Sequence, residues 1–272
     1  MAITNNINTQ INLELSIQIS LSGLSFCILN RNDNTIIALE EIQFKKQLNP
    51  LELLDQVKQC FDNEALLQNK FESLNVIHEN ELSTLVPQTI FNENAIADYL
   101  KFNSKILKSD FVTFDNIDIN QSVNVYIPYV NVNNYIFDLY GDFTYKHAST
   151  VLIETILEWE KNSESSNFYV NVNQNRFEIV VTNQGKLQFY NSFEYATKED
   201  FIYYILFTAE QLKLDTETLN LILLGAVNKN DELYNIAYKY IRNVSFGSLK
   251  NNYKFTNVLK PNHSNFTLIN SF

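Results

Sequence analysis

The sequence contains few of the residues on which several kinds of functional site depend. Its 272 residues include only 5 Gly, 4 Pro, 3 His and 2 Cys. Few glycines leave few places where the backbone can lie close to a ligand. Cys27 and Cys60 form no CxxC motif, and the histidines at 78, 147 and 263 lack the spacing of zinc ligands. The sequence therefore predicts neither a redox motif nor a zinc site.

Positive charge is also scarce, since 20 Lys and Arg stand against 31 Asp and Glu and give a net charge of −11. The acids are scattered, and their field repels nucleic-acid backbones and anionic lipid surfaces. No apolar run approaches the length of a membrane span, and residues 1–20 lack the basic and apolar segments of a signal peptide. We expect no nucleic-acid partner, no direct membrane insertion and a cytoplasmic location.

Apolar and aromatic residues, in contrast, are abundant. Hydrophobic residues make up 45% of the chain, with 20 Phe and 15 Tyr. A chain of this length and composition can bury one large core or two moderate ones. The sequence therefore predicts a packed α/β or α+β protein with few flexible loops.

The first third of the chain predicts three strands, a helix and a fourth strand. Residues 13–19 alternate apolar and polar side chains, as a half-buried strand does, and residues 24–30 and 35–44 continue as two further strands. A helix follows Pro50, and residues 73–77 form the fourth strand. The apolar stripe predicted for this helix consists of Leu51, Leu54, Val57, Phe61, Ala65 and Leu66.

The same order of elements recurs from Asn167. Residues at a constant offset of 151 correspond, namely Ser20, Ser22, Phe26 and Asn32 with Asn171, Asn173, Phe177 and Asn183. Leu51 and Leu54 fall on Ile202 and Ile205 at this offset, and residues 74–77 fall on 219–222 if the second helix is six residues shorter. Chance is the alternative, because strand–turn–strand patterns are common. The restrictive order of the elements favours a duplication, and hence an α/β fold with two β-β-β-α-β halves.

The two hairpins, "ISLSGLSF" and "VNVNQNRF", resemble the "I-D-I-G-x-x-x-I" segment that opens each half of the actin, sugar kinase and heat-shock protein 70 superfamily, in its PilM-like branch. Residues 124–130, 133–141, 142–149 and 150–161 follow that branch's order of strand, short helix, strand and long helix. The chain is also similar to a bacterial family of unknown function, numbered 3822.

The resemblance implies a duplicated ribonuclease H-like, actin-like ATPase fold with two halves around a cleft. Residues 1–163 would form the first half, with an inserted strand-helix-strand-helix segment, and residues 164–272 the second. The division would fall near the loop at 161–166, and Ser20 and Asn171 would face each other across the cleft.

The resemblance also implies a nucleotide site. In the superfamily an Asp of each hairpin helps to hold the hydrated metal, a Gly lets amides approach the phosphates, and a later Gly-Gly turn receives adenosine. The matching residues here are Ser20, Ser22, Gly23, Asn171, Asn173 and Gly225. A Ser or Asn in place of the Asp lacks the charge that orients metal-bound water. A Ser or Asn in place of the Gly adds a Cβ where the backbone should approach the phosphate.

From these departures we predict a vestigial nucleotide cleft with no catalytic or metal-binding residue and no cofactor. Several of the six residues can still donate hydrogen bonds, so ATP with magnesium stays open as an alternative. The leading hypothesis is a non-catalytic interaction scaffold with a protein or peptide partner. Its alternative is a divergent ATP-binding protein, an ATPase or a small-molecule kinase.

Two further groups of residues have plain structural interpretations. The acid pairs Glu40–Glu41 and Glu199–Asp200 are typical of solvated faces and of helix N-termini, with a paired acid/base site as the alternative. An aromatic cluster consists of Tyr126, Tyr129, Tyr135, Phe137 and Tyr140. It predicts either a part of the core whose hydroxyl groups lie at the rim or the lining of a peptide groove.

Overall fold

The computed structural model describes residues 12–102, 104–249, 253–256 and 263–272. The first sheet contains β1 (Leu13–Ile19), β2 (Gly23–Asn30), β3 (Thr35–Gln43), β4 (Ser73–His78), β8 (Thr144–His147) and β14 (Lys254–Phe255). The second contains β9 (Ser166–Val172), β10 (Arg176–Asn183), β11 (Lys186–Glu194), β12 (Asn220–Gly225) and β13 (Asn243–Phe246). The third contains β5 (Ser83–Pro87), β6 (Thr113–Ile117) and β7 (Ser122–Tyr126).

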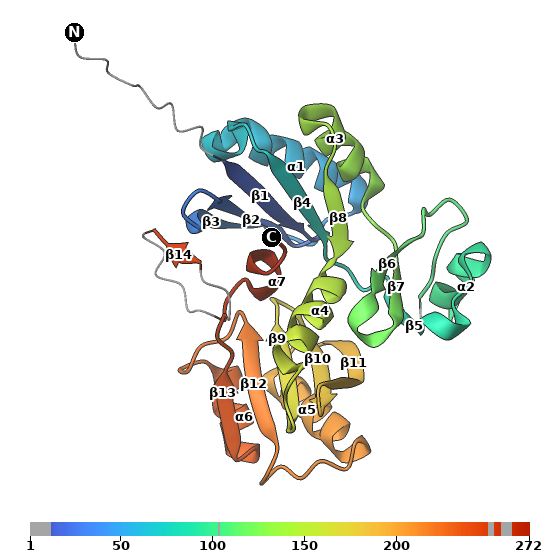
Figure 1. The fold of residues 1–272 in the computed structure, drawn as a ribbon, viewed down its shortest axis with the longest axis vertical. Coiled ribbons are helices and arrows are strands. Elements are labelled where there is room, and N and C mark those ends of the chain that lie inside the picture. Colours follow the sequence, from blue (N-terminus) through green and yellow to red (C-terminus); the bar gives the residue numbers. More distant parts are fainter. Residues whose placement is uncertain (1–11, 103, 250–252, 257–262) are drawn as a thin grey trace.

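Helices connect and cover these sheets (Figure 1). They are α1 (Pro50–Asn63), α2 (Ile96–Lys101), α3 (Val130–Tyr140), α4 (Ala148–Glu160), α5 (Lys198–Gln211), α6 (Glu232–Tyr240) and α7 (Phe266–Ile269). Short 3₁₀ helices occupy Ala65–Gln68, Gln88–Ile90, Glu93–Ala95 and Asp118–Asn120. Within the described ranges, no helix combines the length and the apolar character needed to cross a bilayer.

Apart from the additional edge strand β14 of the first sheet, the two larger sheets have the same topology. In the first sheet the order is β14-β3-β2-β1-β4-β8, and in the second it is β11-β10-β9-β12-β13. In each, the first strand pairs antiparallel with the second and parallel with the fourth. In each, a helix also connects the third strand to the fourth. The predicted duplication of a ribonuclease H-like β-β-β-α-β unit is therefore confirmed.

The offset of 151 between the two hairpins is wrong, because the turns lie two residues further apart. The strand pairing shows which residues form the turns. They are Leu21 and Ser22 in the first hairpin and Gln174 and Asn175 in the second. The turns are thus equivalent at an offset of 153 (174 minus 21). Irregular pairing of the second and third strands, between Ile28/Leu29 and Val181/Thr182, agrees with this offset.

The corrected register changes which residues of the two halves are equivalent. Gln18 matches Asn171, and Ser20 matches Asn173. Side chains on a strand alternate between faces with a period of two residues. A shift of two residues therefore leaves the apolar pattern unchanged, and only the strand pairing reveals it.

The predicted stripe on the first helix is also partly wrong. Leu51 is 76% exposed, while Leu53, Val57 and Phe61 face the core. Ala65 and Leu66 lie outside α1, in the 3₁₀ turn that follows it. Asn49 caps the helix through a reciprocal capping box with Glu52, which places Leu51 in the solvent-facing part of the first turn.

The matching helix α5 starts in the same way. Thr197 and Asp200 form its capping box, and both helices contain 14 residues, so the expected shortening of the second helix is wrong. The buried residues Phe201, Ile205 and Ala209 repeat the spacing of the buried residues in α1.

Two layers of helices cover the outer faces of the sheets. Helices α1 and α3 pack on the first sheet, and α5 and α6 pack on the second (Figure 1). The opposite faces of the two sheets are covered by α4 and α7, and these helices are exchanged. Helix α4 follows the first sheet but packs Leu152 near Val180 of the second. Helix α7 follows the second sheet but packs Leu268 near Leu29 of the first.

The segment between β4 and α3 has no counterpart in the second half. It forms the third sheet, in the order β5-β7-β6, and carries α2 (Figure 1). Its own small core contains Val86, Leu100, Val123 and Val125. Three of the elements expected between the halves belong to the first half, namely α3, β8 and α4. They have counterparts in the second half, which are α6, β13 and α7. The division at residue 163 stays a prediction.

The exchanged helix α7 is expected to be essential for stability despite its length of four residues. Leu268 is fully buried, so Leu268→Ala should cost about 2–5 kcal/mol in the free energy of unfolding. The matched control Leu51→Ala, on an exposed side chain, should change it by less than about 0.5 kcal/mol. Urea denaturation measures both. Equal effects of the two substitutions would contradict the packing described for α7.

Candidate functional site

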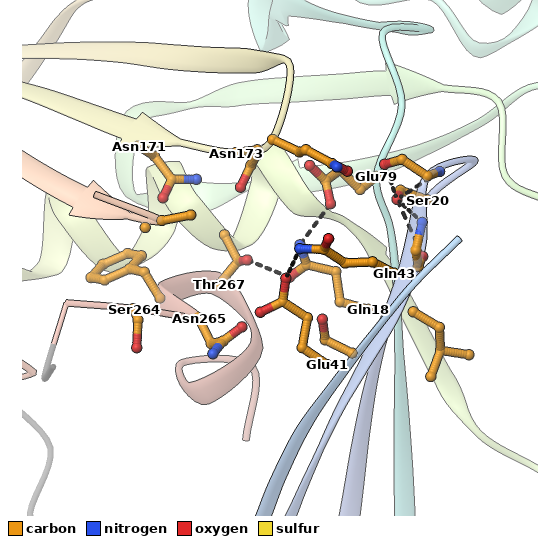
Figure 2. Close-up of a pocket in the computed structure, with 18 of the residues that line it drawn as sticks. Gln18, Ser20, Glu41, Gln43, Glu79, Asn171, Asn173, Ser264, Asn265 and Thr267 are labelled. Carbon is orange, nitrogen blue, oxygen red and sulfur yellow. Dashed lines mark hydrogen bonds between the residues drawn. The ribbon is translucent and has the colours of Figure 1, made fainter. Parts of the chain in front are cut away.

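A cleft of about 290 Å³ lies between the two halves, where both hairpins turn (Figure 2). All six residues predicted from the sequence line it, namely Ser20, Ser22, Gly23, Asn171, Asn173 and Gly225. Asn171 and Asn173 extend from the second half toward Gln18, Glu41 and Glu79 of the first (Figure 2). The structure thus brings the predicted residues together, and their binding of a nucleotide stays a prediction.

In the first hairpin, Ser20 bonds to its own turn. Its Oγ accepts hydrogen bonds from the backbone N–H groups of Ser22 at 3.2 Å and Gly23 at 3.1 Å. The same oxygen lies 3.0 Å from the Ser22 hydroxyl. Two of the amides at the hairpin tip are therefore directed at a side chain of the hairpin rather than at a ligand.

Gly23 has a structural reason to be glycine. A Cβ there would lie 2.8 Å from the Ile42 carbonyl oxygen on β3, closer than real Cβ atoms approach. Its position in the sheet therefore explains this glycine without a ligand.

In the second hairpin, the side-chain nitrogen of Asn171 forms a hydrogen bond within the second half. Its side chain is 4% exposed, and its Nδ2 donates to Glu178 Oε2 at 3.0 Å. The Asn173 backbone N–H donates to the Arg176 carbonyl at 2.9 Å, and the Asn173 carbonyl accepts from the Tyr195 hydroxyl at 3.0 Å. The backbone of this turn is held by the second half itself.

Gly225 ends β12 with a φ of +79°, which favours glycine. A Cβ there would lie 2.2 Å from the Val172 carbonyl oxygen and 2.9 Å from Asn171 Oδ1. The Gly225 N–H donates to the His263 carbonyl at 2.7 Å. The turn that the resemblance assigns to adenosine is thus hydrogen-bonded to the C-terminal segment.

Gln18 and Glu79 also line the cleft, although no sequence motif marks either residue. Gln18 Nε2 donates to Glu79 Oε2 at 2.8 Å, and Thr267 of α7 donates to Gln18 Oε1 at 2.5 Å (Figure 2). The correct register would have identified Gln18 as the counterpart of Asn171. Glu79 directly follows the parallel strand β4, and the carboxyl ends of parallel strands are frequent places for site residues.

The cleft is electrostatically negative. Burial raises the pKa of Glu79; the nearby carboxylates of Glu178 and Glu41 raise it further, while the Gln18 hydrogen bond and Arg176 lower it. Among the residues that the structure describes, no Lys or Arg lines the cleft. Arg176 lies in an adjoining hollow of about 560 Å³, which shares Ser20, Ser22, Glu79, Asn173 and Gln174 with the cleft.

Metal ligands do not converge here. Within the described residues, no group of three or more His, Cys, Asp or Glu side chains is placed to hold a metal ion. Burial lowers the pKa of His78 to about 4 and that of His147 to about 3. His78 Nε2 lies 2.9 Å from Asn133 Oδ1, and His147 Nδ1 accepts the Ser149 N–H at the start of α4. Both imidazoles are neutral parts of the core.

The other predicted groups also have structural roles. Asp200 belongs to the capping box of α5, and its hydrogen bonds to Thr197 and Ala196 lower its pKa, which confirms its interpretation as a helix N-terminal charge. In the aromatic cluster, Tyr126 and Tyr129 are buried, whereas Phe137 is 54% exposed. The acidic residues Glu40 and Glu41 lie on β3, and Glu41 is part of the cleft wall.

A family model described as "Protein of unknown function (DUF3822)" matches residues 3–244 of the sequence. The chain belongs to the DUF3822 family. This membership confirms the similarity to the family numbered 3822. A comparison with curated proteins finds no match.

Two solved structures share the fold of this DUF3822 protein. A protein of unknown function with an actin-like ATPase fold, from Bacteroides thetaiotaomicron VPI-5482, is 24% identical, with a TM-score of 0.77 over 87% of this chain and 91% of the other. The PilM–PilN type IV pilus biogenesis complex contains a chain that is 12% identical, with a TM-score of 0.57 over 89% and 90%. These likenesses confirm the actin-like ATPase fold.

The raised pKa of Glu79 predicts a pH-dependent cost in stability. The folded state favours the protonated form, so the protonated carboxyl contributes stability below the unfolded pKa; this stability is lost, and the cost appears, as pH rises through the folded pKa. We therefore expect Glu79→Gln to be more stable than the wild type at pH 8.5, with a smaller advantage at pH 5.5. Urea denaturation at both pH values measures the difference.

Glu93→Gln, on an exposed carboxylate, is the matched control and should show no such advantage. A Glu79→Gln protein less stable than the wild type at pH 8.5 would contradict the described electrostatics.

Proposed function

We propose that this DUF3822 protein is a non-catalytic interaction scaffold, and that its cleft neither binds nor hydrolyses a magnesium-bound nucleoside triphosphate. The observation that carries the proposal is the Ser20 hydroxyl, which accepts the N–H groups of Ser22 and Gly23. Phosphate sites of this kind depend on free backbone N–H groups that point at the ligand. Here the hairpin itself uses two of them.

The charge of the cleft supports the same proposal. A triphosphate needs cations or N–H donors around its oxygens. The cleft instead presents the carboxyl groups of Glu41 and Glu79, and the Gly225 amide donates to His263. A triphosphate placed here would meet this repulsion with no Lys or Arg among the described lining residues to offset it.

A magnesium ion would also lack its usual protein ligand. The superfamily's Asp corresponds to Gln18 or Ser20 in the first hairpin, and to Asn171 or Asn173 in the second, depending on the register used. Each of these side chains is uncharged, so neither register supplies the carboxylate that orients metal-bound water. This supports the absence of hydrolysis and argues against the alternative of an ATPase or a kinase.

A protein or peptide partner is the second part of the proposal. A chain with this fold has been solved in the PilM–PilN complex, so the fold is compatible with a role in protein assembly. The cytoplasmic location expected from the sequence remains part of the proposal.

Calorimetric titration with Mg-ATP tests the proposal. We expect no saturable heat with the wild type, because the hairpin amides and the charge of the cleft both oppose phosphate. The comparison variant restores the superfamily residues in the corrected register, as Gln18→Asp, Ser20→Gly, Asn171→Asp and Asn173→Gly. Its circular dichroism spectrum checks that it is folded.

Weak magnesium-dependent binding by this variant alone would agree with a cleft that has lost its phosphate-binding residues. Saturable, magnesium-dependent binding by the wild type would contradict the proposal.

A further inference from the structure

One side-chain oxygen in the cleft wall, Asn171 Oδ1, belongs to a largely buried residue and is available to a ligand. Asn171 Nδ2 donates to Glu178, while Oδ1 lies beside Gly225 of the cleft wall and accepts no hydrogen bond from the part of the chain that the structure describes. Figure 2 shows this side chain at the cleft wall, across from Glu41. A side chain that is only 4% exposed and leaves an acceptor unpaired favours a ligand that donates a hydrogen bond.

The carboxyl groups point to the charge of that ligand. Glu79 and Glu41 line the same cleft as Asn171, with no Lys or Arg among the described lining residues. The cation Arg176 lies in the adjoining hollow, where its Nη1 is 3.9 Å from Glu81 Oε2 and its Nη2 donates to Ser192 at 2.9 Å. The cleft thus offers hydrogen-bond acceptors and negative charge together.

Resting on the proposed function, we infer that the cleft binds a guanidinium group, held between the carboxyl group of Glu79 and the amide oxygen of Asn171. A guanidinium carries five N–H donors in a planar fork and no acceptor, which complements this lining. It also pairs with a carboxylate through two parallel hydrogen bonds. At about 290 Å³, the cleft suits one side chain or a small molecule.

The adjoining hollow favours an Arg side chain of a partner over a free guanidine. It opens from the cleft at Ser20 and Glu79 and carries the further acids Glu81, Glu194 and Asp200. A basic peptide that placed its Arg in the cleft would continue along these carboxylates. A small guanidine would leave them unused.

The first arm of the test uses agmatine, a small guanidine, and thermal unfolding. At several times its Kd, agmatine should raise the Tm of the wild type by about 2–4 °C. The rise should vanish in Glu79→Gln and persist in the control Glu93→Gln. Glu41→Gln, which should reduce the rise, provides a second variant on another strand.

The second arm compares a blocked peptide containing one Arg between Lys residues with the same peptide carrying citrulline, which keeps the shape and loses the charge. Tighter binding of the Arg peptide than of agmatine would assign the guanidinium to a protein partner, and tighter binding of agmatine would assign it to a small molecule. Both results support the guanidinium site, provided that the citrulline peptide does not bind.

No Tm rise with either guanidinium probe, or an equal rise in Glu79→Gln, would overturn this inference and leave the proposed function standing. A Tm rise with Mg-ATP would instead contradict the proposed function, whatever the guanidinium probes show. The two failures are therefore distinguishable in one series of measurements.

Discussion

The exchange of two helices between the halves holds the cleft in place. Helix α4 packs on the second sheet and α7 on the first, and they meet where the Trp159 and Phe266 rings contact edge to face at 4.9 Å. The residue after Phe266, Thr267, reaches Gln18 in the cleft. Because each half supplies the helix that covers the other, the positions of the two hairpins depend on this shared core.

Within that frame, the polar groups of the cleft mostly satisfy one another. Ser20 binds the amides of its own turn, and Gln18 links Thr267 to Glu79. Buried polar groups are stable when they are hydrogen-bonded, so this arrangement favours a fixed, closed set of contacts over an open phosphate site. The lining also carries the carboxyl groups of Glu41 and Glu79 and, among the described residues, no Lys or Arg.

The sequence could predict the order of the elements and the duplication, because periodicity and turn residues are local signals. The six residues of the cleft came from the resemblance of the hairpins to the actin-like superfamily. It could not predict the register of the hairpins, since a shift of two residues keeps every side chain on the same face. Nor could it distinguish Leu53 from Leu51 as the core residue. Each can lie on the same helix face as Phe61, and only the packing of the helix decides between them. Glu79 carried no motif, and its place depends on the pairing of β4 with β1.

The central claim is that the Ser20 hydroxyl, rather than a phosphate, occupies the amides of the first hairpin. Backbone ¹H–¹⁵N NMR spectra of the wild-type protein, recorded during titration with Mg-ATP, test this at the two atoms concerned. The account predicts that the amide resonances of Ser22 and Gly23 keep their positions throughout the titration. Saturable, magnesium-dependent shifts of both resonances would contradict it.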